Sequence, residues 1–209
     1  MDQAAWTNRK KSAVWRQIVK MKISQQTELL HILGMEIPCQ MREYRRQIES
    51  DDETNREAMA SKVYFNALFG SQFKRFSPDT INAGLNYRYA ILRSAFSREI
   101  VMMGYSTALG IHHCSRQNPY NFSCDLMEPF RPFVDRIVWT NQNRELNWEY
   151  REELIRLLYT ECIYNGKTTD IQTAIQFFVR DITYGMEMPR YQIKEIHFEK
   201  TQGRNRSHV

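Results

Sequence analysis

Apolar residues recur at helical spacing along much of this 209-residue chain. The clearest stripe consists of Ile81, Leu85, Tyr89, Leu92, Phe96, Ile100 and Met103. Residues three and four positions apart share one face of an α-helix. Gly104 follows the stripe, and glycine is common just after a helix end. The pattern predicts a long, buried helix at the centre of the core.

Weaker stripes with the same period predict further helices on both sides of this one. They cover residues 12–33, 38–49, 55–69, 148–164 and 170–184, and each except the second is followed by a glycine within two residues. Thr54 or Asn55 is the expected N-cap of the third. Its first turn carries Glu57. The helix dipole stabilises a carboxylate at this position, so helix stability by itself would explain the acid.

Another helix is expected to begin at Asp125. Glu128 lies three residues later, the spacing of a capping box. Pro129 and Pro132 each remove a backbone donor, so we expect an irregular first turn. Phe130 and the apolar residues after it supply the buried face.

The two ends of the chain differ from this pattern. Residues 191–199 alternate weakly like a short strand, and residues 201–209 are polar and expected to be disordered. No apolar run approaches the ~18 residues of a membrane span, and the N-terminus has no signal-peptide core. The expectation is a soluble, cytoplasmic, all-α protein with no membrane partner and at most a short C-terminal strand, in which residues 1–200 form one domain.

The net charge of +5 is mildly basic, but its distribution is informative. Between positions 6 and 22 the charged residues are all basic: Arg9, Lys10, Lys11, Arg16, Lys20 and Lys22. One reading is a solvated helix face. The other is a surface that contacts nucleic-acid phosphates, since each neutralised phosphate releases counterions.

Two familiar motifs are weak here. Gly166-Lys167-Thr168 lacks the first glycine of a P-loop, because position 161 is Glu, and it follows an expected helix. We interpret it as a helix end followed by a threonine N-cap. The four cysteines (Cys39, Cys114, Cys124, Cys162) form no C-x-x-C pair and are expected to be reduced thiols.

A histidine pair lies beside two of these cysteines. His112 and His113 with Cys114 and Cys124 leave a zinc site as an alternative, although the spacing matches no closed zinc pattern. A second candidate combines Glu57, His113 and Glu128. Two carboxylates and one imidazole suit a divalent ion such as Mg²⁺ or Mn²⁺.

Five strings, spread over most of the chain, carry a family resemblance. They are Trp15-x-x-Ile18-Val19-x-x-Lys22-Ile23-x-x-Gln26, Arg56-Glu57-Ala58-x-Ala60-x-Lys62-Val63-Tyr64-Phe65, Ile81-Asn82-Ala83-x-Leu85-Asn86-Tyr87-x-Tyr89, Leu109-Gly110-Ile111-His112-His113 and Asp125-Leu126-Met127-Glu128-Pro129-Phe130-Arg131-Pro132. Together and in this order, they resemble the integrase–nuclease of CRISPR adaptation, CRISPR-associated protein one, and most closely its type II branch.

The resemblance implies a helical catalytic domain in which Glu57, His113 and Glu128 bind Mg²⁺ or Mn²⁺. Asp125 then supports the site from behind. His112 has no ligand role and is expected either to pack or to face DNA. The implied reaction joins the 3′-hydroxyl ends of spacer DNA to the repeat by transesterification, and water in place of the hydroxyl gives endonuclease activity. Arg131 and the basic residues of the first helix would hold DNA phosphates, or Arg131 would pair with Glu128.

The resemblance also implies partners. They are double-stranded spacer and repeat DNA, a second copy in a homodimer, a small adaptation protein that bridges two dimers, and the type II effector nuclease. Family members carry an N-terminal β-rich domain before the Trp15 helix, and this chain begins almost at that helix. An alternative is therefore a catalytically idle DNA-binding or assembly subunit that lacks the dimerisation domain.

Overall fold

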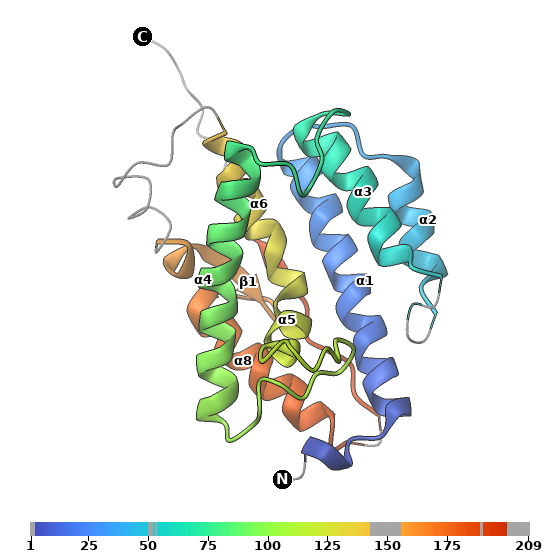
Figure 1. The fold of residues 1–209 in the computed structure, drawn as a ribbon, viewed down its shortest axis with the longest axis vertical. Helices are drawn as coiled ribbons and strands as arrows, with labels where there is room; N and C mark the ends of the chain where they lie inside the picture. The colour runs from blue at the N-terminus through green and yellow to red at the C-terminus, as the bar shows by residue number, and fades with distance from the viewer. Residues whose placement is uncertain (1–2, 50–51, 53, 143–155, 189, 200–209) are drawn as a thin grey trace.

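The computed structural model describes residues 3–49, 52, 54–142, 156–188 and 190–199, and they form a mostly helical fold (Figure 1). Its α-helices are α1 (Asn8–Ile32), α2 (Cys39–Gln47), α3 (Arg56–Phe69), α4 (Thr80–Met102), α5 (Asn121–Met127), α6 (Arg131–Thr140) and α8 (Ile171–Gly185). Short 3-10 turns lie at η1 (Gln3–Ala5), η3 (Glu128–Phe130) and η4 (Arg156–Tyr159). The helical fold class is confirmed.

The central helix is α4, as its apolar period predicts. Leu85, Leu92, Phe96 and Ile100 are fully buried, and the helix packs on α5, α6 and α8. The ring of Phe96 meets that of Phe130 edge-on at a centroid distance of 5.1 Å. These contacts join the centre of α4 to the turn η3, from which the candidate site is built.

The helix α1 lies on the other side of the α5–η3–α6 segment from α4 (Figure 1). It begins at Asn8, where the Thr7 side chain accepts from the amide of Lys10. It contacts α2, α3, η3 and α6 as well as the small sheet, so most of its circumference is covered. For this reason Lys22 and two glutamines of α1 are buried along with its apolar residues.

A three-stranded antiparallel sheet completes the fold. Its strands are β1 (Glu161–Tyr164), β2 (Lys167–Asp170) and β3 (Ile196–Phe198), in the order β2-β1-β3. The strand expected within 191–199 is confirmed, but the helix expected up to residue 164 is wrong at its end. Asn165 and Gly166 both have positive φ (50° and 76°), the Asn-Gly signature of a tight hairpin turn.

The hairpin also corrects the interpretation of the neighbouring residues. Thr168 lies in β2, and the N-cap of α8 is Asp170, whose carboxylate accepts from the amide of Thr173 at 2.7 Å. The residues 148–155 and 201–209, for which a helix and a disordered tail are expected, lie outside the described residues. Within the described ranges, no helix is both long and apolar enough to cross a membrane.

Candidate active site

Glu57 reaches the site from the first turn of α3. Asn55 occupies the N-cap position, as expected, but makes no side-chain capping bond. The buried carboxylate of Asp52 does so instead, accepting from the amides of Arg56 (2.9 Å) and Glu57 (2.8 Å). The backbone at Glu57 is therefore held by an acid that sequence reasoning missed.

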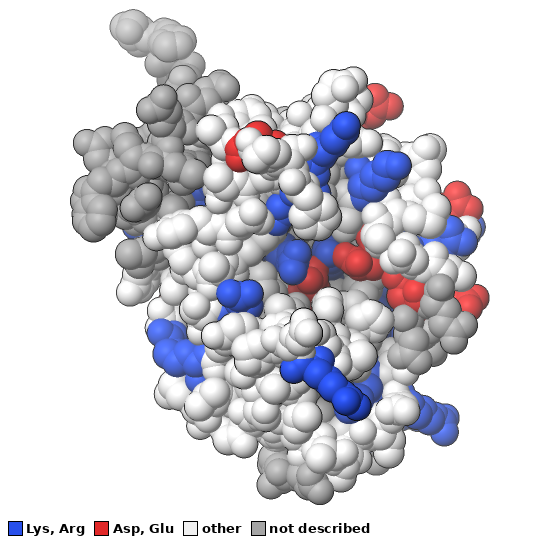
Figure 2. Space-filling model, viewed as in Figure 1, with Lys and Arg blue, Asp and Glu red and all other residues white. Residues whose placement is uncertain are grey.

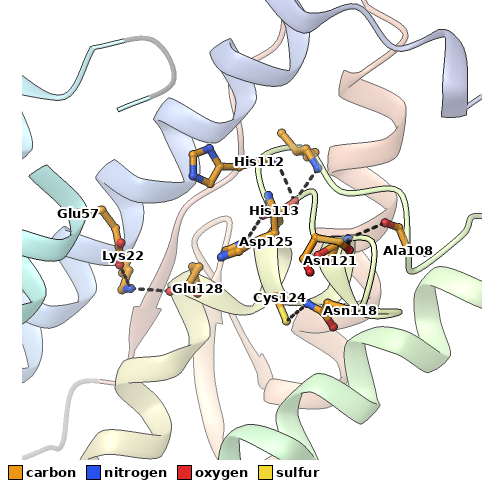
Figure 3. A network of polar contacts seen from close by, with 12 residues as sticks. Lys22, Glu57, Ala108, His112, His113, Asn118, Asn121, Cys124, Asp125 and Glu128 are labelled. Atoms are coloured by element: carbon orange, nitrogen blue, oxygen red, sulfur yellow. Dashed lines mark hydrogen bonds and ion pairs between the residues drawn. The ribbon is translucent and has the colours of Figure 1, made fainter. Parts of the chain in front are cut away.

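Lys22 of α1 lies between Glu57 and Glu128 (Figure 3). Its ammonium forms an ion pair with Oε1 of Glu57 and another, at 2.6 Å, with Oε2 of Glu128. Arg131 binds the other oxygen of Glu128, Oε1, at 2.9 Å. Two carboxylates from distant parts of the chain thus converge on one nitrogen.

Mutual charge stabilises this cluster in the interior. The charge of Lys22 lowers the pKa of Glu57 to about 2. Burial by itself lowers the pKa of Lys22, but the carboxylates of Glu128 and Glu57 outweigh it and raise that pKa above its ordinary value. A buried charge without a partner costs several kcal/mol, so Lys22 and Arg131 compensate the two acids.

His113 belongs to a loop held by Asp125. The carboxylate of Asp125 is completely buried. It accepts from the amides of Ile111 (2.6 Å), His112 (3.0 Å) and His113 (3.1 Å), and it contacts Nδ1 of the His113 ring at 2.6 Å. This hydrogen bond raises the pKa of His113 and turns Nε2 away from Asp125. A carboxylate behind an imidazole is the usual support of a metal-binding histidine.

The capping-box interpretation of Asp125 is wrong. Asp125 lies within α5 and uses its side chain for the 111–113 loop, while Glu128 begins η3. The irregular turn expected from the prolines is confirmed, since η3 interrupts the path from α5 to α6. That turn brings Glu128 and Arg131 to the same side as Lys22.

Gly110 is required by the close approach of the loop to itself. A Cβ atom there would lie 2.1 Å from the carbonyl oxygen of His113 and 2.8 Å from Oδ2 of Asp125. The ring of His112 stacks on that of Trp15, at a centroid distance of 4.3 Å and an angle of 3°. His112 thus anchors the loop to α1, the packing role that the sequence left open.

The basic residues expected to bind DNA divide into two groups. Those at the surface of α1, exposed or half-buried, are Arg9, Lys10, Lys11, Arg16 and Lys20. Lys22 differs from these residues because it is buried and its ammonium forms ion pairs with two carboxylates. Arg131 pairs with Glu128, as one of its two readings expected. Phosphate contact by the surface group stays a prediction.

A cavity of about 600 Å³ opens beside the acidic pair, lined by Lys22, Glu57 and Arg131 together with basic and aromatic residues of the 65–76 region. Figure 2 shows acidic and basic side chains meeting in a hollow near the middle of this face. The lining includes Lys62, Lys74 and Arg75. The cavity therefore carries one acid, Glu57, among five basic side chains.

The donor set fits a divalent ion in part. Glu57 and Glu128 both contact the same nitrogen, so their oxygens are close enough to share a cation, and carboxylates suit Mg²⁺ or Mn²⁺. In the part of the chain that the structure describes, no three His, Cys, Asp or Glu side chains are grouped tightly enough to hold a metal. His113 is thus outside the pair in this conformation, and the zinc alternative gains no support.

Comparison with known sequences shows the family of this chain. A family model described as CRISPR associated protein Cas1 matches residues 1–158. The chain belongs to this family. It is 40% identical over 182 residues to the CRISPR-associated endonuclease Cas1 of Neisseria meningitidis serogroup C (strain 8013), covering 84% of this chain and 60% of that protein. Identity to the CRISPR-associated endonuclease Cas1 1 of Francisella tularensis subsp. novicida (strain U112) is 30% over 145 residues, covering 60% of this chain and 46% of that protein.

The chain thus aligns with about half to three fifths of the length of these relatives. Solved structures share its fold at low identity. A casposase bound to integration product superposes with a TM-score of 0.76 at 17% identity, over 91% of this chain and 66% of that one. A CAS1 protein from Thermotoga maritima superposes with a TM-score of 0.74 at 13% identity, over 88% of this chain and 68% of that one. The resemblance inferred from the five strings is confirmed at the level of the family.

Proposed function

We propose that this chain is the helical catalytic part of a metal-dependent DNA endonuclease and integrase of CRISPR adaptation. The observation that carries the proposal is the convergence of Glu57 and Glu128 at the edge of a basic-walled cavity. The His113–Asp125 pair on the neighbouring loop supports it. Both relatives named above are endonucleases by description.

Glu57, Glu128 and His113 would hold Mg²⁺ or Mn²⁺, with His113 binding through Nε2 as a neutral imidazole. When bound, such an ion polarises a phosphodiester and lowers the pKa of the attacking hydroxyl. Asp125 orients the imidazole from behind, and Arg131 holds the free oxygen of Glu128. Lys62, Lys74 and Arg75 on the cavity wall would position phosphates.

The reaction we propose is a phosphoryl transfer in which a DNA 3′-hydroxyl attacks a phosphodiester of the repeat. One P–O bond forms and another breaks, and the hydroxyl proton passes to solvent while the leaving 3′-oxygen gains one. Water as the attacking group gives strand cleavage by the same site. Both reactions need the hydroxyl and the phosphate held in line, which is the task of the cavity walls.

The assemblies of two structural neighbours support double-stranded DNA and protein partners for this chain. One similar fold is bound to an integration product, and another, at a TM-score of 0.68 and 19% identity, is in a Cas6-RT-Cas1–Cas2 complex. We extend these partners to this chain as a homodimer that binds spacer and repeat DNA, with a small adaptation protein that bridges two dimers. The type II effector nuclease is a further partner implied by the type II resemblance.

A catalytically idle subunit is the second candidate, because Lys22 and Arg131 already neutralise both acids. The two candidates differ in one assay. Duplex DNA with 3′-hydroxyl ends is incubated in Mn²⁺ with a supercoiled plasmid bearing the repeat. Strand joining or nicking that disappears in His113→Ala and Glu128→Ala, and persists in the exposed control Glu36→Ala, supports the enzyme. DNA binding without any metal-dependent product contradicts it.

A further inference from the structure

The ammonium of Lys22 lies at the point where a cation shared by Glu57 and Glu128 would lie. Lysine is unusual there, because Lys22 follows Trp15 by seven positions and Ile18 by four on the buried face of α1, and it is only 5% exposed. Such a lysine needs fixed anionic partners. The two glutamates supply them.

The charges of this cluster are already balanced without a further cation. Two carboxylates face one ammonium and one guanidinium, so the cluster of Lys22, Arg131, Glu57 and Glu128 is neutral as it stands. A divalent ion added to it would leave two positive charges uncompensated in a largely buried site, where charges interact more strongly than in water. One of the two basic groups must therefore move away.

The atoms that each basic group contacts decide which one moves. Arg131 binds Oε1 of Glu128, the oxygen that Lys22 does not contact. Lys22 binds Oε2 of Glu128 and Oε1 of Glu57, the oxygens that a bridging metal would use. Metal and Lys22 are thus alternatives at the same two atoms, whereas Arg131 can remain where it is.

The displaced ammonium has a place to go. Lys22 lines the cavity of about 600 Å³ beside Glu57. Its four-carbon stem changes rotamer without moving the backbone of α1. An ammonium turned into this cavity faces the space in which a phosphate of the substrate would lie.

We infer that Lys22 is a resident counter-ion of the site, which holds Glu57 and Glu128 together without metal and yields both oxygens when a divalent ion binds. This inference rests on the proposed function, because it presumes that the two glutamates take up a metal. Lys22 is thereby a positioning residue, and its effect is measurable in metal binding without any DNA.

The first test is a calorimetric titration of Mn²⁺ into the whole protein and into Lys22→Met, which keeps the length of the side chain and removes its charge. The matched control is Lys20→Met on the outer side of the same helix. We expect Lys22→Met to bind Mn²⁺ about ten-fold more tightly or better, and Lys20→Met to bind like the unchanged protein. In EDTA, Lys22→Met should have a lower melting temperature than the unchanged protein, and Mn²⁺ should raise the melting temperature of the variant by more. Equal or weaker binding by folded Lys22→Met overturns the inference.

The second test needs no variant that might fail to fold. The unchanged protein is acetylated briefly in EDTA or in Mn²⁺, and the labelling of each lysine is measured by mass spectrometry. Labelling of Lys22 should rise several-fold in Mn²⁺ while that of Lys20 stays constant; constant Lys22 labelling overturns the inference. If neither the unchanged protein nor Lys22→Met binds Mn²⁺, the proposed function fails too. If both bind it equally, only this inference fails.

Discussion

The two halves of the candidate site are built in opposite ways. In the His113 half, one buried carboxylate binds three consecutive backbone amides and a ring nitrogen, and every partner lies within 14 residues of Asp125. In the acidic half, Glu57 and Glu128 come from separate helical segments and meet through Lys22 of a third. The first half is neutralised by local hydrogen bonds, and the second by ion pairs across the fold.

This difference separates two tasks. A loop held by its own backbone orients an imidazole whether or not a metal is bound. A pair of acids held by a movable ammonium can change partner when another cation arrives. Variants of the His113 half should therefore disturb the orientation of the imidazole, whereas variants of the acidic half should disturb the binding of cations. The following predictions run from the largest expected effect on DNA joining to the smallest.

Glu128→Gln should have the largest effect. It removes one of the three proposed metal ligands, takes the ion pair with Glu128 from Arg131, and leaves Lys22 paired with Glu57 alone. We expect strand joining to fall by at least about a hundred-fold. The free energy of unfolding in EDTA should fall by about 3 kcal/mol, the cost of breaking a buried pair. Urea unfolding and the plasmid assay measure both, with Glu36→Gln as control. Retained joining would remove Glu128 from the site.

Asp125→Asn should weaken the hydrogen bonds that hold the His113 loop without removing a proposed metal ligand. The amide is the same size as the carboxylate but accepts more weakly from three amides and the ring. The pKa of His113, raised by this contact, should return towards its ordinary value, and joining should fall by about 10–100-fold. NMR titration of the His113 ring reports the pKa directly.

The sign of the pH effect follows from the raised pKa. The His113–Asp125 contact stabilises the folded state fully below the unfolded pKa of the histidine, and this stability is lost as pH rises through the higher folded pKa. Asp125→Asn should therefore lose more stability at pH 5 than at pH 8. An equal loss at both values would mean that the contact does not depend on the charge of His113.

Gly110→Ala should act on the same half through sterics alone. The added Cβ would lie 2.1 Å from the carbonyl oxygen of His113, so the loop must shift. We expect a loss of about 1–3 kcal/mol of unfolding free energy and a several-fold loss of joining. The exposed neighbour Leu109→Ala is the matched control. If Gly110→Ala lowers Mn²⁺ affinity as much as Glu128→Gln, the two halves are not independent.

Asp135→Asn should leave joining almost unchanged, because Asp135 lies behind the acidic half. It is buried and accepts from the hydroxyls of Tyr64 (2.8 Å) and Tyr89. Burial raises its pKa from 3.8 to about 6. The folded state therefore binds a proton more tightly than the unfolded state, and stability falls as pH rises from about 4 to 6.

The size of this fall is at most roughly 3 kcal/mol, since one pKa unit corresponds to about 1.4 kcal/mol. Asp135→Asn should remove it, so the variant should gain stability relative to the unchanged protein between pH 4.5 and pH 7. Urea unfolding at these two values measures the difference. A difference that is independent of pH would show that Asp135 keeps one protonation state.

Sequence patterns predicted much of the helical fold but failed where short-range signals competed. The apolar stripe of α4 and the glycine after α3 identify their helices because both reflect local geometry. The hairpin turn at Asn165-Gly166 was missed because a glycine also suits the end of a helix. Only the positive φ angles of both residues distinguish the turn. Asp125 has capping-box spacing to Glu128, yet the loop at 111–113 offers it closer donors.

The sequence by itself determined which residue types could do chemistry, and it placed Gly110, His113 and Asp125 within 15 positions of one another. It also carried a sign of the internal cation, namely a lysine on the apolar face of α1 with Trp15 and Ile18. Only the tertiary structure decided that this lysine joins Glu57 to Glu128. Periodicity reports which face of a helix is buried, but the partner of a buried charge depends on how distant helices pack.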